Sequence, residues 1–129
     1  MGLIYTEIKL TNLLSPEIES YFATALVDTG ALHLCIPQHI ANQLKLKQLE
    51  EREVTIADGS KRLVPYVGPV QITFKNRNCF TGAMVLGEEV LLGAIPMEDM
   101  DLIVQPSLLK VTVNPQSPNI PMSVAKGQS

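Results

Sequence analysis

Apolar and polar residues alternate along much of this chain with the period of two that is typical of β-strands. The alternation is clear in residues 3–10 and again in residues 70–76. Residues 21–28 and 32–36 are apolar on both faces, which predicts short strands in the centre of a sheet. Further short strands are predicted for residues 51–57, 62–68, 79–87, 90–95, 102–104 and 108–113.

One segment, residues 37–46, has a good helical pattern. Pro37 suits the first helical position, and one face carries three apolar residues, Ile40, Ala41 and Leu44. Residues 96–100 are too short for more than one or two helical turns. Many short strands with a single main helix predict an all-β fold, closed into a barrel or packed as a sandwich.

Length and composition suit one domain with an aliphatic core. The chain has 129 residues, of which 46% are hydrophobic, and it has no tryptophan. The last 16 residues, 114–129, contain three prolines and little that could pack. We therefore expect one domain over residues 1–113, followed by a Pro-containing tail that is mobile or lies on a partner.

Charge and hydropathy exclude some classes of partner. The net charge is -3, and no stripe of lysine and arginine indicates a nucleic-acid surface. No apolar stretch approaches the ~20 residues of a membrane helix, and the N-terminus is a poor signal peptide. We expect a cytoplasmic protein that binds neither nucleic acid nor membrane. Two cysteines do not make a disulfide framework, so both should be reduced.

The stretch ALVDTGALHLCIP, residues 25–37, sets Asp28 between two apolar runs. Asp-Thr-Gly alone is ordinary turn chemistry, because Asp bonds to nearby backbone and Gly accepts a positive φ. Here the flanks predict a turn inside the apolar layer. A lone ionised carboxylate in such a place costs several kcal/mol unless it is hydrogen-bonded or neutralised. The pattern therefore indicates a functional acid.

Four features in this order resemble the retroviral-type (retropepsin-like) aspartic proteases and their single-lobe bacterial relatives. They are LVDTGA at 26–31, a helix ending in IANQLKL at 40–46, IADGS at 56–60 and VLLGAIPMEDM at 90–100. The resemblance runs from about residue 4 to residue 113. It implies a closed acid-protease-like barrel with one main helix and a hairpin flap, acting as a homodimer.

The resemblance also implies an activity, that of an aspartic endopeptidase. The chain holds a single Asp-Thr-Gly, so the second catalytic aspartate would be Asp28 of an identical chain. Two close carboxylates share a proton and activate a water molecule. The supporting turn would be Thr29, Gly30 and Ala31. Neither a metal nor a cofactor is expected, and the partners are a peptide or protein substrate and a second copy.

The flap and the cleft follow from the same resemblance. The flap tip would be Ala57, Asp58, Gly59 and Ser60, although Asp58-Gly59 is also a plain hairpin turn. The substrate cleft would be lined by Leu32, His33, Leu34, Cys35, Val85 and Leu86. The family usually pairs an Asp with an Arg where this chain has Leu32 and Ala94. Both charges are absent together, so the packing survives and the cleft should prefer apolar side chains.

Two other interpretations remain open. The chain could be a non-catalytic homodimeric domain of the same fold that binds peptides or only dimerises. A metal site could use the neighbouring side chains of His33, Cys35 and His39 with Cys79, but no standard zinc spacing is present.

Overall fold

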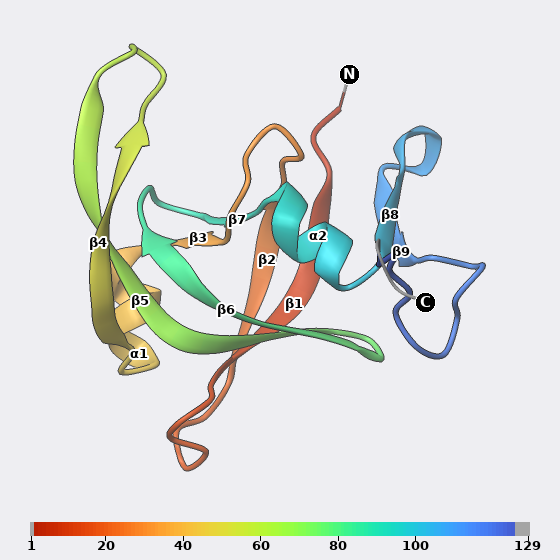
Figure 1. Cartoon of the computed structure of the whole chain (residues 1–129), viewed down its shortest axis with the longest axis horizontal. Helices are drawn as coiled ribbons and strands as arrows, with labels where there is room; N and C mark the ends of the chain where they lie inside the picture. Colours follow the sequence, from red (N-terminus) through yellow and green to blue (C-terminus); the bar gives the residue numbers. More distant parts are fainter. Residues whose placement is uncertain (1, 126–129) are drawn as a thin grey trace.

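The computed structural model describes residues 2–125, in which nine strands and two six-residue helices surround an apolar core (Figure 1). The elements follow in the order β1 Tyr5–Asn12, β2 Tyr21–Val27, β3 Cys35–Ile36, α1 Gln38–Gln43, β4 Lys47–Thr55, β5 Lys61–Phe74, β6 Arg77–Val85, β7 Val90–Leu92, α2 Ala94–Asp99, β8 Leu102–Gln105, the 3-10 helix η1 Pro106–Leu108, and β9 Lys110–Val113.

Six strands close into a barrel because β1 pairs on both of its edges. It runs antiparallel to β2 and to β5, so that Leu10 lies opposite both Tyr21 and Ile72. The order around the barrel is β1-β2-β7-β3-β6-β5. The pairs β2–β7 and β3–β6 are parallel and the others antiparallel. The predicted all-β, closed acid-protease-like barrel is therefore confirmed, while the homodimer stays a prediction.

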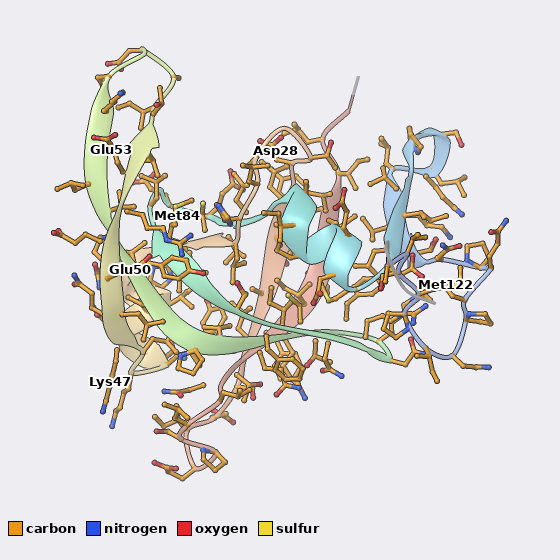
Figure 2. The ribbon with its side chains drawn as sticks, in the orientation of Figure 1. Asp28, Lys47, Glu50, Glu53, Met84 and Met122 are labelled. Atoms are coloured by element: carbon orange, nitrogen blue, oxygen red, sulfur yellow. The ribbon has the colours of Figure 1, made fainter. Side chains whose placement is uncertain are left out.

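A long hairpin of β4 and β5 extends beyond the barrel. β5 has 14 residues, and it pairs with β6 only from Tyr66 onward. Its first part has β4 as its neighbour and rises with it from one end of the barrel (Figure 1). Figure 2 shows charged residues along β4, namely Lys47, Glu50 and Glu53. This hairpin is the predicted flap, and the two strands predicted at 62–68 and 70–76 are one strand.

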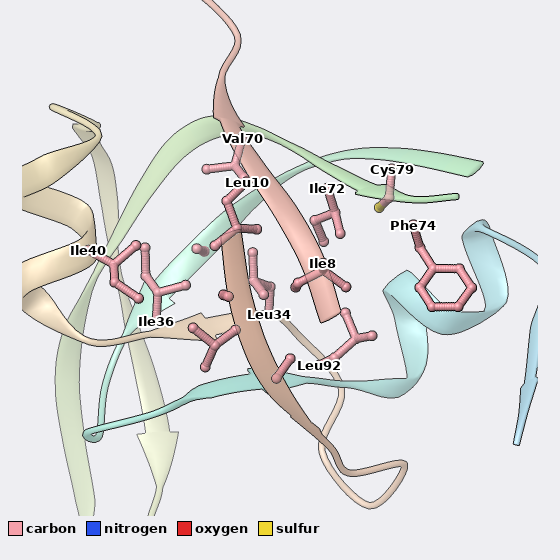
Figure 3. Close-up of a cluster of buried hydrophobic side chains, with 14 of the residues drawn as sticks. Ile8, Leu10, Leu34, Ile36, Ile40, Val70, Ile72, Phe74, Cys79 and Leu92 are labelled. Carbon is pink, nitrogen blue, oxygen red and sulfur yellow. The ribbon is translucent and has the colours of Figure 1, made fainter. Parts of the chain in front are cut away.

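The side chains that point into the barrel form a mainly aliphatic core (Figure 3). Several of them are completely buried, namely Leu10, Ile36, Leu44, Ile72 and Leu92. Phe74 is an aromatic member of this cluster. Burial of apolar area contributes about 25 cal/mol per Å² to the free energy of folding. In this chain the buried area comes mainly from aliphatic side chains, because aromatic residues are few.

The ends of two elements differ from the sequence prediction. The helix α1 is shorter than residues 37–46, because Pro37 is its N-cap and Lys45 turns the chain with a φ of 52°. The strand predicted at 32–36 is reduced to Cys35–Ile36. The carbonyls of Ala31 and Leu32 accept hydrogen bonds from the start of α2 and are therefore not available to a strand ladder.

The C-terminal segment, residues 114–122, packs against its own chain. The carboxylate of Asp101 accepts hydrogen bonds from Asn114 Nδ2 (3.1 Å), from Ser117 Oγ and from the backbone N–H of Met122 (2.9 Å). Arg77 on β6 is completely buried and donates from Nη2 to the carbonyl of Ser117. The expectation of a mobile tail is therefore wrong for this segment, because its hydrogen bonds with Asp101 and Arg77 hold it on the barrel.

Residues 126–129 lie outside the described residues. The domain boundary at residue 113 stays a prediction.

We predict that Asp101 stabilises the fold in a pH-dependent way. The hydrogen bond from Ser117, followed by those from Met122 and Asn114, lowers the pKa of Asp101 below 3.8. The stabilisation should therefore be full above about pH 4 and be lost as the pH falls through the folded-state pKa. Asp101→Asn keeps a residue that tolerates the φ of 55°, so the thermal midpoint should fall at pH 7 because the charge is lost.

The control is Glu98→Gln, which removes an exposed carboxylate from the same stretch of chain. Thermal unfolding of the three proteins at pH 7 and about pH 3 should show a gap between parent and Asp101→Asn that narrows in acid. Equal midpoints at pH 7 would contradict the role of this carboxylate.

Candidate active site

Asp28 projects from a hydrogen-bonded turn directly after β2 (Figure 2). Its backbone N–H donates to the carbonyl of Leu92 (3.0 Å), which ties the turn to β7. The N–H of Gly30 donates to Asp28 Oδ1 (3.0 Å), and the N–H of Ala31 donates to the Asp28 carbonyl (3.1 Å). One oxygen of the carboxylate is thus fixed by the turn itself, and the other has no hydrogen-bond partner among residues 2–125.

The turn is held from behind by Gly93, the glycine that follows β7. A Cβ at Gly93 would lie 2.6 Å from the backbone N and O of His33 and 2.6 Å from the carbonyl carbon of Leu32. Next to this contact, the N–H of Ala94 donates to Ala31 O (2.8 Å) and the N–H of Ile95 donates to Leu32 O (2.9 Å). Two backbone segments therefore cross here at a distance that only glycine permits.

These backbone bonds stand where the family usually has a charged pair. Leu32 is 58% exposed and Ala94 is half-buried. The hydrogen bonds from Ala94 and Ile95 to the Asp28 turn join the start of α2 to this turn, although no charged pair links them. In this chain the two segments are therefore packed together by backbone hydrogen bonds.

Asp28, Thr29 and Gly30 are exposed in the single chain. The expectation that the carboxylate lies inside the apolar layer is therefore wrong for one subunit. The strands on either side are apolar, but the turn between them leaves the end of the barrel. Exposure there avoids the desolvation penalty of an ionised carboxylate.

The flap tip, residues 56–60, is an ordered turn. Asp58 Oδ1 accepts hydrogen bonds from the Ser60 N–H (2.8 Å) and from Ser60 Oγ (2.6 Å), and these bonds lower the pKa of Asp58. Gly59 has a φ of 87°, so a side chain at this position would be strained. Ala57, the fourth predicted tip residue, is exposed. The tip is therefore a defined hairpin turn, which both sequence interpretations of Asp58-Gly59 had predicted.

A second apolar cluster, here called the apolar wall, connects the flap to the strands beside Asp28. It consists of Cys35, Val64 and Met84, with Val54, Tyr66, Leu86 and Leu91 packed against them. Cys35 pairs with Leu91, which in turn lies opposite Leu26 on β2, two residues before Asp28. The wall thus starts beside the Asp28 turn and continues under the flap.

The structure divides the predicted cleft residues into three groups. Cys35 and Leu86 belong to the apolar wall. Leu34 and Val85 belong to the main core, so they are not part of this wall. Leu32 is exposed and His33 half-buried, both close to the Asp28 turn.

Sequence reasoning missed the wall residues on the flap, on β6 and on β7. They are Val54, Val64, Tyr66, Met84 and Leu91. Alternation along the two flap strands was a usable signal, because Val64 and Tyr66 share one face of β5.

Neither cysteine is poised for nucleophilic chemistry. Both thiols are free and buried, as the sequence predicted for reduced cysteines. Burial, together with a hydrogen bond to Asp99, raises the pKa of Cys79 to about 12, and burial raises the pKa of Cys35. Both therefore remain protonated near neutral pH, whereas the thiolate is the reactive form.

Residues 2–125 contain no group of three or more His, Cys, Asp or Glu side chains placed to hold a metal ion. In the same part of the chain, neither helix has the length and hydropathy needed to cross a bilayer.

The family model described as "gag-polyprotein putative aspartyl protease" matches residues 15–98, which include both the Asp28 turn and the flap. The chain belongs to this family. No curated protein matches the chain significantly in sequence.

Three solved structures are similar to this chain. The retroviral protease-like domain of Ddi1 from Leishmania major is 12% identical, with a TM-score of 0.56 over 98% of this chain and 100% of that one. The protease of Simian Foamy Virus (mac) is 13% identical, with a TM-score of 0.45 over 71% and 91%. A Legionella pneumophila protein of unknown function is 16% identical, with a TM-score of 0.41 over 78% and 91%. The family match and the likeness to the Ddi1 domain confirm the retropepsin-like fold predicted from the sequence.

We predict that Gly93→Ala destabilises the protein by about 3 kcal/mol, because the new methyl group meets backbone that cannot move independently. Gly30→Ala is the matched control, since its Cβ would meet only Asp28 Oδ1, at 3.2 Å. That change should cost less than about 1 kcal/mol. Urea unfolding measures both values, and equal losses would show that the crossing at Gly93 tolerates a side chain.

Proposed function

We propose that this aspartyl protease-like protein is an active endopeptidase built from two copies of the chain, each contributing Asp28. The observation that carries the proposal is the Asp28 turn, whose carboxylate is held by Gly30 and lies exposed at the start of the apolar wall. One chain supplies one such carboxylate, and the turn that carries it is exposed to solvent. A second copy related by a two-fold axis would supply the other and cover both.

Exposed apolar side chains around the turn support this second copy. The backbone of Val27 bonds to Ile4 (2.8 Å), which brings Leu3 near the turn, and Leu109 lies against Gly2. Four large apolar residues from these neighbouring segments are 47–67% exposed, namely Leu3, Leu32, Ile95 and Leu109. Apolar surface of this kind is typical of a face that another protein covers.

The chemistry follows from placing two carboxylates close together. They cannot both ionise easily, so the pair holds one proton in mildly acid solution. The ionised carboxylate takes a proton from a water molecule, whose oxygen attacks the peptide carbonyl carbon. The other carboxyl group donates its proton to the carbonyl oxygen. The C–N bond then breaks as the nitrogen receives a proton from the first carboxyl group and the second carboxylate takes a proton from a hydroxyl of the tetrahedral intermediate. The pair thus returns to its starting protonation state, and one water is consumed per bond cleaved.

The remaining residues of the site position these groups in the proposal. Thr29 would bond across the two-fold axis, and Gly30 and Ala31 would leave room for the second turn and the substrate. The flap would fold over the bound peptide, and the apolar wall would accept its aliphatic or aromatic side chains. The second candidate function, a dimer that binds peptides without cleaving them, uses the same wall and flap and differs only in the use of Asp28.

We predict a dimer of about twice 14.1 kDa in sedimentation at micromolar concentration. Leu109→Asp should shift it toward monomer, because a charge would enter the apolar contact. Asp tolerates the left-handed φ of 51° at this position, so the single chain should keep its fold. The control is Leu14→Asp, at a residue that is 70% exposed in the β1–β2 connection at the other end of the molecule (Figure 1). A parent that stays monomeric even with a peptide-like inhibitor would remove the proposed mechanism.

We predict that Asp28→Asn abolishes cleavage of a diverse peptide library at about pH 4 to 6 while the fold is kept, since the amide cannot accept a proton from water. The variant dimer should be at least as stable as the parent at pH 7, because the repulsion between two carboxylates is absent. Parent cleavage that a statine-type inhibitor stops, together with an inactive variant, supports catalysis. Peptide binding by a parent that cleaves nothing would instead favour the non-catalytic function.

A further inference from the structure

The inner face of the flap carries cationic groups next to the apolar wall. In the β4–β5 ladder Arg52 lies opposite Val64, and Glu50 lies opposite Tyr66. Directly opposed residues point to the same side of a hairpin. Because Val64 and Tyr66 belong to the wall, Arg52 and Glu50 share its side of the hairpin. Alternating exposure agrees, since Arg52 and Val54 are half-buried while Glu51 and Glu53 are exposed.

Arg52 is held in one plane by two contacts. Its guanidinium carbon lies 3.7 Å from the centre of the Tyr66 ring, and Nε donates to Glu50 Oε2 at 2.7 Å. Tyr66 is itself fixed, because its ring occupies the space of a Cβ at Gly82 (2.4 Å) and its hydroxyl accepts the Gly82 N–H (3.2 Å). The guanidinium therefore rests on a rigid support, so little conformational entropy remains to be lost when it binds a ligand.

The two terminal nitrogens of Arg52 have no hydrogen-bond partner among residues 2–125, and the side chain is 36% exposed. Arg62, opposite Val54, is on the same face. This face thus has two guanidinium groups against the one carboxylate of Glu50. On the other face Lys61 and Glu53 approach to 4.0 Å. The inner face therefore has an excess of positive charge in a chain whose net charge is -3.

We propose that Arg52 is a specificity-determining residue that binds a carboxylate side chain of the peptide in the site. The inference rests on the proposed function. The free edge of a guanidinium presents two N–H groups in the geometry that a carboxylate accepts. The selected peptide would have aliphatic or aromatic residues against the apolar wall and an aspartate or glutamate at one fixed distance from them. The stacked Arg52–Tyr66 pair would be a recognition element of the flap.

The test selects peptides from a displayed random library with full-length protein carrying Asp28→Asn, so that bound peptides are not cut. We expect enrichment of aspartate or glutamate at one position relative to an apolar pair. Arg52→Glu should change the preference at that position to lysine or arginine. Arg52→Gln, which adds no repulsion toward Glu50, should remove the preference and weaken binding of an acidic peptide about tenfold. The control is Lys61→Glu, which makes the same charge change as Arg52→Glu but on the other face of the flap. This control should select the same peptides as the protein that carries Asp28→Asn alone.

Cleavage by the protein with Asp28 intact separates this inference from the proposed function. Arg52→Gln should raise KM for an acidic peptide about tenfold relative to KM for a matched neutral peptide, with a much smaller effect on kcat. Cleavage or binding with no acidic preference, or a preference that Arg52→Glu does not change, would overturn the role of Arg52 alone. Acidic selection without any cleavage would support Arg52 while removing catalysis. A protein that selects no peptides would contradict both.

Discussion

The close crossing of Gly93 with the backbone of Leu32 and His33 is the contact on which the candidate site depends. It brings the start of α2 within hydrogen-bonding distance of the Asp28 turn, and the bonds from Ala94 and Ile95 follow from it. A larger residue would separate the two segments and release the turn from the barrel. Contacts and hydrogen bonds between main-chain atoms thus fix the position of the Asp28 carboxylate, far more than the surrounding side chains do.

The barrel and the flap share one strand, β5, and this sharing organises the molecule. The second part of β5 contributes Val70 and Ile72 to the main core, whereas the first part contributes Val64 and Tyr66 to the apolar wall. Two hydrophobic clusters can therefore serve different purposes. One holds the barrel together, and the other joins the flap to the strands beside Asp28. Movement of the flap need not disturb the main core, because the hairpin leaves the barrel before β6 begins to pair.

The sequence predicted the features that depend on local signals. The Asp28 turn, the hairpin at Asp58-Gly59 and the glycine after β7 lie where residue types indicated, because turns demand particular backbone angles. Contacts between distant segments left no such signal. The closure of β1 on β5, the docking of residues 114–122 on Asp101 and the exposure of Asp28 all depend on which surfaces meet in three dimensions. Apolar flanks show that a segment runs through a core, but they do not show where the chain emerges from it.

The backbone bonds around Asp28 have a consequence for how freely its surroundings can vary. Because main-chain atoms fix the turn, its geometry depends mainly on one glycine and on the Asp-Thr-Gly itself, and makes few demands on the neighbouring side chains. The residues at 32 and 94, and with them the polarity of the surface beside the acid, can therefore be exchanged without rebuilding the frame that holds it.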